Sequence, residues 1–154
     1  MRDAVILPDP TETILTASTI QAWHFYAQIV SEQHSVYLQV WRPTSPDSDH
    51  YTLVGQTHIH PSELRFHELV LSADQFVRTE SGDVLGLFFP KYNPIGWSAV
   101  PCVNPLQRYR FVETPDEVVV GKTLHFKTST SAVDACRQYS LKALFGESSW
   151  RNII

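Results

Sequence analysis

Short apolar stretches separated by turn residues run along most of this chain. One near-unbroken apolar stretch, Val84–Phe89, follows the turn residues Ser81, Gly82 and Asp83 and is ended by Pro90. A run this short, rich in Val, Leu and Phe and bounded by turn residues, is typical of a strand that is buried on both faces. The sequence therefore predicts that this stretch is the central strand of a β-sandwich.

Alternation of apolar and polar residues predicts further strands. In residues 14–30, one side of the predicted strand carries Trp23, Phe25, Ala27 and Ile29. This alternation is typical of a half-buried strand, although the absence of Gly and Pro keeps a helix as the alternative. Residues 34–43 and 49–60 alternate in the same way around a polar loop, which is the pattern of a hairpin. The last predicted strand, residues 137–145, has a buried side formed by Tyr139, Leu141, Ala143 and Phe145.

About nine such strands and no clear amphipathic helix predict an all-β fold, an antiparallel two-sheet β-sandwich of jelly-roll-like form. A chain of 154 residues suits one domain that buries its core without metal or disulfide support. We expect this domain at residues 13–146, after a Pro-rich lead-in segment at residues 1–12 and before a C-terminal tail at residues 147–154.

Charge and hydropathy narrow the range of partners. The net charge is −4, with 12 basic residues and no basic cluster, so nothing supports nucleic-acid binding. No stretch approaches the length of a transmembrane span, and we expect no membrane insertion. The apolar run Ala4–Leu7 is too short for the core of a signal peptide and is ended by Pro8. The chain is therefore expected to be intracellular or a module of a larger protein, and homo-oligomer formation stays open.

The two cysteines leave two interpretations open. Cys102 follows a turn and Cys136 opens a strand-like run, so both lie at element ends where two strands can meet. A disulfide closing a loop of that size would stabilise the fold by roughly 3–4 kcal/mol through chain entropy, and it would indicate an oxidising compartment. The alternative is a pair of buried free thiols.

Seven segments carry a resemblance to a known family, in the order WHFYAQ, VYLQVWRP, YTLVGQT, SGDVLGLFFP, YNPIGW, VPC and CRQYSLKA. They resemble an extracellular β-sandwich module of secreted and membrane-bound multidomain proteins of invertebrates, where it stands beside adhesive and receptor domains. The resemblance covers most of residues 14–145 and rests on strand and turn residues. It implies a β-sandwich, a disulfide between Cys102 and Cys136, an extracellular or secreted location, and a binding or architectural role.

The segment THIHPSELRFHEL holds a candidate metal site formed by His58, His60, Glu63 and His67. An H-x-H pair on a strand puts both imidazoles on one face, which is how small β-barrels such as cupins begin a metal site. Glu63 follows the pair too closely for the cupin pattern, and no histidine follows Asp83 at the matching place. The alternative is a polar strand face with solvated histidines.

Other chemistry has weaker support. No serine stands in a G-x-S-x-G setting, and neither cysteine has a nearby histidine in a recognisable signature. Asp47 and Asp49 offer hard oxygen ligands at alternate positions, which suit Ca²⁺, but they lack the length and the closing Glu of an EF-hand loop. The expected cofactor is therefore none, with a divalent metal, Zn²⁺ or Ca²⁺, as the alternative.

The loop after the central strand, Lys91–Trp97, is the candidate ligand site. Tyr92 and Trp97 offer aromatic faces, Asn93 offers a donor and an acceptor, and Lys91 adds a cation. Sugar rings and peptide prolines are bound by such a combination of stacking and amide hydrogen bonds. The alternative is that Trp97 caps the core and Tyr92 only lines a turn.

These patterns favour a non-catalytic extracellular binding or adhesion module that recognises carbohydrate or protein through loops at one end of the sandwich. The alternative is a cupin-like metal-binding protein or metalloenzyme that uses His58, His60 and Glu63. The spacing of Glu63 and the missing later histidine favour the binding module over the enzyme.

Overall fold

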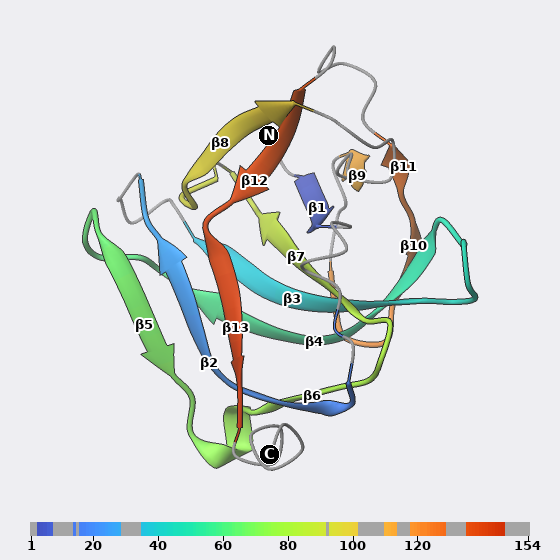
Figure 1. The fold of residues 1–154 in the computed structure, drawn as a ribbon, viewed down its shortest axis with the longest axis horizontal. Coiled ribbons are helices and arrows are strands. Elements are labelled where there is room, and N and C mark those ends of the chain that lie inside the picture. Colours follow the sequence, from blue (N-terminus) through green and yellow to red (C-terminus); the bar gives the residue numbers. More distant parts are fainter. Residues whose placement is uncertain are drawn as a thin grey trace.

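The computed structural model describes residues 3–7, 14, 16–28, 35–91, 93–101, 110–113, 118–128 and 135–146. At residues 3–7, 97, 99–101, 110–111, 113, 128 and 135–138 only the backbone is described. Within these residues the regular structure is strand, apart from one short 3-10 helix, η1 (Ala73–Gln75). Every pairing of the named strands is antiparallel, and the strands form packed layers (Figure 1). The predicted all-β, antiparallel β-sandwich is therefore confirmed.

The larger sheet has seven strands in the order β10-β4-β3-β7-β1-β9-β11. Their bounds are β1 Asp3–Leu7, β3 Val36–Pro43, β4 His50–Ile59, β7 Val84–Phe89, β9 Arg110–Glu113, β10 Thr123–His125 and β11 Lys127–Thr128. Only Phe126 separates β10, which pairs with β4, from β11, which pairs with β9. One short segment thus joins both ends of the sheet, which curls onto itself along the right side of Figure 1.

A second layer lies across the larger sheet (Figure 1). It has the strand order β13-β2-β5, with β6 also pairing with β2, and a two-stranded ribbon of β12 and β8 stands beside it. Their bounds are β2 Ser18–Tyr26, β5 Phe66–Val70, β6 Val77–Thr79, β8 Trp97–Pro101, β12 Ala135–Tyr139 and β13 Leu141–Phe145. Ser140 alone separates β12 from β13, so one predicted strand is divided between the ribbon and the sheet.

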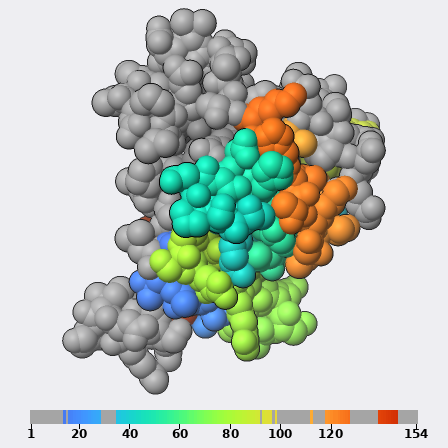
Figure 2. All heavy atoms as spheres, turned by 90° about the vertical axis from the view of Figure 1, so that its right-hand side faces the viewer, coloured from blue at the N-terminus to red at the C-terminus, as the bar shows by residue number. Residues whose placement is uncertain are grey.

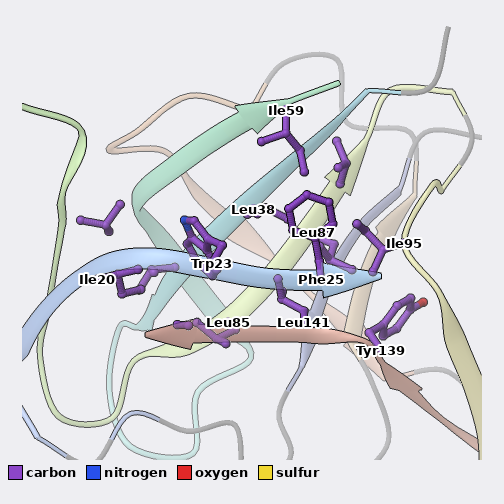
Figure 3. Close-up of a cluster of buried hydrophobic side chains, with 14 of the residues drawn as sticks. Ile20, Trp23, Phe25, Leu38, Ile59, Leu85, Leu87, Ile95, Tyr139 and Leu141 are labelled. Atoms are coloured by element: carbon purple, nitrogen blue, oxygen red, sulfur yellow. The ribbon is translucent and has the colours of Figure 1, made fainter. Parts of the chain in front are cut away.

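The main core fills the space between the two layers. Figure 3 shows Trp23 and Phe25 of β2 directed toward Leu38 of β3 and Leu87 of β7, and these side chains are at most 4% exposed. The alternation predicted for residues 14–30 is confirmed here, because Trp23 and Phe25 are buried while Tyr26 on the opposite side is exposed.

A second cluster lies on the other face of β7. It consists of Trp41, Tyr51, Leu53, Val84, Phe88, Val118 and Phe126. The curl of the larger sheet brings Phe126 against Trp41, with ring centroids 5.0 Å apart and planes at 77°. All six residues of β7 are buried as a result, and this confirms the predicted central strand.

Two details differ from the sequence-based expectation. Residues 3–7, placed in the lead-in segment, form β1 and pair with both β7 and β9, so the sheet extends into that segment. The described residues contain 13 strand segments rather than about nine, because breaks at Phe126 and Ser140 divide longer stretches and β1 is added. The predicted tail at residues 147–154 lies outside the described residues.

Candidate functional site

A cleft of about 510 Å³ opens where several strands begin or end. It is lined by Tyr26, Gln28, Phe66, Gly96, Ser98, Tyr139 and Ser140. Tyr26 is the last residue of β2, Phe66 is the first of β5, and Tyr139 is the last of β12. Because residues at these strand ends line it, the cleft lies at one end of the second layer; Figure 1 shows β2 and β5 of this layer side by side on the left.

Backbone hydrogen bonds build the floor of the cleft around Gly96. The Gly96 N–H donates to the Tyr26 carbonyl at 2.8 Å, and the Ser140 N–H donates to the Gly96 carbonyl at 2.8 Å. A Cβ atom at Gly96 would stand 3.0 Å from Cδ1 of Tyr26. Glycine therefore lets the Tyr26 ring lie close against the backbone of the loop that leads into β8.

Two aromatic rings form the apolar wall of the cleft. Tyr26 and Phe66 are register partners on β2 and β5, and their rings meet edge to face with centroids 5.1 Å apart and planes at 66°. Tyr26 is 36% exposed and Phe66 is 68% exposed. Large apolar rings held in this way in water offer a flat surface on which an apolar face of a ligand can stack.

The predicted ligand loop, Lys91–Trp97, contributes only in part. Its end borders the cleft through Gly96, and Ser98 follows on β8. The Asn93 side chain is used within the loop, because its Nδ2 donates to the Ile95 carbonyl at 3.1 Å and its Oδ1 accepts from the Ile95 N–H at 2.8 Å. This amide therefore closes a turn, and its role as a ligand contact stays a prediction.

The remaining residues of the predicted ligand loop are Lys91, Tyr92 and Trp97. Lys91 is exposed. Tyr92 lies outside the described residues, and of Trp97 only the backbone in β8 is described. The two exposed aromatic residues that border the cleft, Tyr26 and Phe66, were not selected as ligand contacts from the sequence. The outward position of Tyr26 in the alternation of residues 14–30 was the available signal.

The predicted histidine site is partly assembled. The imidazole centroids of His58 and His60 are 4.6 Å apart, and the His58 ring stacks on Tyr37 at 4.0 Å. Partial burial, and then the charge of His60, lower the pKa of His58. His67 joins both histidines in lining a second pocket of about 360 Å³. The metal assignment to these residues stays a prediction.

Glu63 and His67 have other partners within the same segment. The carboxylate of Glu63 accepts a hydrogen bond from Nε of Arg65, which lowers the pKa of Glu63. The Nε2–H of His67 donates to the Glu63 carbonyl oxygen at 2.7 Å, and its ring stacks on Phe25 with centroids 5.1 Å apart. Glu63 does not line the pocket that the three histidines share.

A different group of potential metal ligands emerges from the fold. Among the described residues, only Asp49, His50 and His125 bring three such atoms within 4.8 Å of one another. The hydrogen bond from His125 is the main cause of the lowered pKa of Asp49. Asp49 was considered from sequence as a calcium ligand together with Asp47, but its proximity to His125 depends on strand pairing and was missed.

The predicted disulfide falls outside the described side chains. Cys102 is not described, and only the backbone of Cys136 is. The β8–β12 ladder pairs Val100 with Cys136 and Pro101 with Ala135. The bridge between Cys102 and Cys136 therefore stays a prediction.

Comparisons of the chain with known protein families, with curated proteins and with solved structures found no match. Among the described residues, no helix has the length and hydrophobicity needed to cross a membrane. The interpretation of the chain therefore depends on the geometry of its own residues.

Proposed function

We propose that this chain is a non-catalytic extracellular binding module that recognises a carbohydrate at the end of its sandwich. The observation that carries this proposal is the cleft in which the exposed rings of Tyr26 and Phe66 stand beside polar side chains. A sugar ring presents an apolar face of C–H groups and a rim of hydroxyls. The apolar face of the sugar would stack on Phe66, and Gln28 and Ser98 can hydrogen-bond to its hydroxyls.

The size and rigidity of the cleft support the same proposal. Its volume of about 510 Å³ falls in the usual range of small-ligand sites, about 300–1,000 Å³. The Ala27–Ile95 bridge and the backbone bonds of Gly96 hold the rings on paired strands. Little ordering entropy is therefore lost when a ligand binds.

A glycan array with the purified chain tests the proposal directly. We expect Phe66→Ala to weaken binding at least tenfold, which corresponds to about 1.4 kcal/mol, because it removes the most exposed ring. The matched control is Val70→Ala, since Val70 is 69% exposed on the same strand and does not line the cleft. Both surface changes should alter stability by only about 0.5 kcal/mol.

A second variant tests the cleft without removing either ring. Gly96→Ala places a methyl group 3.0 Å from the Tyr26 ring, so the ring must shift and glycan binding should fall while Val70→Ala still binds. Equal glycan binding by wild type, Phe66→Ala and Gly96→Ala would exclude this cleft as the site.

A protein ligand is the second candidate, because exposed apolar residues lie at or beside both ends of β5. Val70 at the end of the strand is 69% exposed, and Leu64, which precedes the strand, is 61% exposed. Among the described strands β5 pairs only with β2. An open strand edge with apolar side chains is a surface to which another chain can add a strand. Loss of a protein partner in Val70→Ala, with no glycan bound by the wild type, would favour this function.

A further inference from the structure

Asp49, His50 and His125 meet at the base of the turn between β3 and β4. His50 begins β4, His125 ends β10, and the two are direct register partners in the β4–β10 ladder. Their rings stack with centroids 4.6 Å apart and planes at 10°. Figure 2 shows this turn, in teal, directly beside the orange segment that contains β10. The pairing of two strands thus places both imidazoles on one surface.

The carboxylate of Asp49 stands between the two imidazoles. Its Oδ1 lies 3.0 Å from Nδ1 of His50, and its Oδ2 lies 2.8 Å from Nε2 of His125. Each ring nitrogen that faces the carboxylate donates a hydrogen bond to it. One oxygen ligand and two nitrogen ligands therefore converge from two strands.

Backbone and side-chain hydrogen bonds hold this arrangement in place. The Phe126 N–H donates to the Asp49 carbonyl at 2.8 Å, and the Thr44 N–H donates to the His50 carbonyl at 3.0 Å. The hydroxyls of Thr52 and Thr123 lie 2.7 Å apart in the register pair two positions further along the ladder. The register that brings the histidines together is thus fixed on both sides of the group.

We propose that Asp49, His50 and His125 bind one divalent transition-metal ion of the Zn²⁺ class. Imidazole nitrogens with a carboxylate oxygen are a common ligand set for Zn²⁺, whereas Ca²⁺ prefers oxygen ligands alone. Ligand atoms around a tetrahedral Zn²⁺ lie roughly 3.3–3.5 Å apart. The three atoms here already lie within 4.8 Å of one another. Side-chain rotation alone can therefore complete the site.

Exposure of the three side chains defines the kind of site. All three are exposed, so the ion would bind with its fourth position open to water or to an external ligand. The ring nitrogens that now face Asp49 must be unprotonated to bind the ion, and in a neutral imidazole the proton then moves to the other ring nitrogen. The site lies where the start of β4 pairs with β10, which is at the right of Figure 1, whereas the cleft is lined by residues of other strands, among them β2 and β5 on the left of the figure. It therefore does not depend on the proposed carbohydrate function.

The test uses the untagged chain, stripped of metal with a chelator and titrated with ZnCl₂ by isothermal calorimetry. We expect one equivalent to bind, and His125→Gln or Asp49→Asn to raise the Kd more than about tenfold, since even outer partners of metal ligands affect affinity by about 10- to 100-fold. The matched control is the double variant His58→Gln/His60→Gln, which should bind as wild type does. Co²⁺ should give the visible absorption of a low-coordinate site in the wild type and the control.

Several outcomes would overturn the proposal. Zinc binding that is unchanged in both His125→Gln and Asp49→Asn, or lost in the His58→Gln/His60→Gln control, places the metal elsewhere. Failure of the wild type to bind one equivalent of ZnCl₂ means that the group is only a hydrogen-bonded surface cluster. Circular dichroism of the metal-free variants checks folding, and Asp49→Asn, which changes one atom of one side chain, keeps the test valid if His125→Gln unfolds.

Discussion

The ion pair between Arg42 and Asp83 allows a quantitative test of the fold at the turn into β7. Asp83 is fully buried, at 0% exposed, and its carboxylate accepts hydrogen bonds from Arg42 Nε at 2.8 Å, Arg42 Nη2 at 3.0 Å and the Glu80 N–H at 2.8 Å. The Arg42 side chain is 35% exposed, and its pKa is raised chiefly by the hydrogen bond to Asp83. Because the two side chains are so unequally buried, removing Arg42 and removing Asp83 should lower the free energy of unfolding by different amounts.

Arg42→Met leaves a buried carboxylate that keeps only the Glu80 N–H as a donor. Removing one partner of a buried pair usually costs about 3–5 kcal/mol, and solvent near the half-buried guanidinium site places the expected value toward the lower end. Asp83→Asn keeps the size of the side chain and one acceptor oxygen, while Arg42 can be rehydrated. Losing hydrogen bonds to a charged group costs about 1.5–3 kcal/mol, so Asp83→Asn should be the milder change.

Urea unfolding, with linear extrapolation to water, measures both free energies, and equal m-values would show that the compared states are the same. The double variant Arg42→Met/Asp83→Asn should lose less stability than the sum of the single changes, because the second change removes the charge that the first leaves unpaired. Equal destabilisation by Asp83→Asn and Arg42→Met, or simple addition of the two effects, would contradict these unequal roles of the two partners.

Two further predictions concern the core and the cysteines. Leu87→Ala should lower the free energy of unfolding by about 2–5 kcal/mol, since Leu87 is fully buried at the centre of the main core; a loss under about 1 kcal/mol in urea unfolding would contradict its central position. If Cys102 and Cys136 form a disulfide, native and denatured chain should resist alkylation until reduced, and reduction should cost roughly 3–4 kcal/mol. Two thiols freely alkylated in protein made under oxidising conditions would refute the bridge and, with it, the extracellular assignment.

Strands could be predicted where a local pattern of apolar residues, either a continuous run or an alternation, marks the buried positions. The six apolar residues of Val84–Phe89 required cover on both faces, and the structure supplies it with Leu87 in one cluster and Phe88 in the other. Trp23 and Phe25 followed from simple alternation for the same reason. By contrast, Asp3–Leu7 is a short segment whose role depends on pairing with β7, about eighty residues away, and no local pattern carries that information.

Side chains from distant segments meet through register, and register explains why the best site candidates were missed. On a single strand, residues two apart share a face but are separated by about 6.5–7 Å of rise. Direct partners across an antiparallel ladder have Cβ atoms about 4.5–5.5 Å apart. A search by sequence spacing therefore selects pairs such as His58 and His60, whereas the ladder places His125 opposite His50 and Phe66 opposite Tyr26. In an all-β chain such cross-strand partners are separated by tens of residues, so sequence spacing cannot find them, although the rings of His58 and His60 lie as close, at 4.6 Å, as those of His50 and His125. A three-ligand site is then most easily built from one cross-strand pair and a sequence neighbour, which is the arrangement of His50, His125 and Asp49.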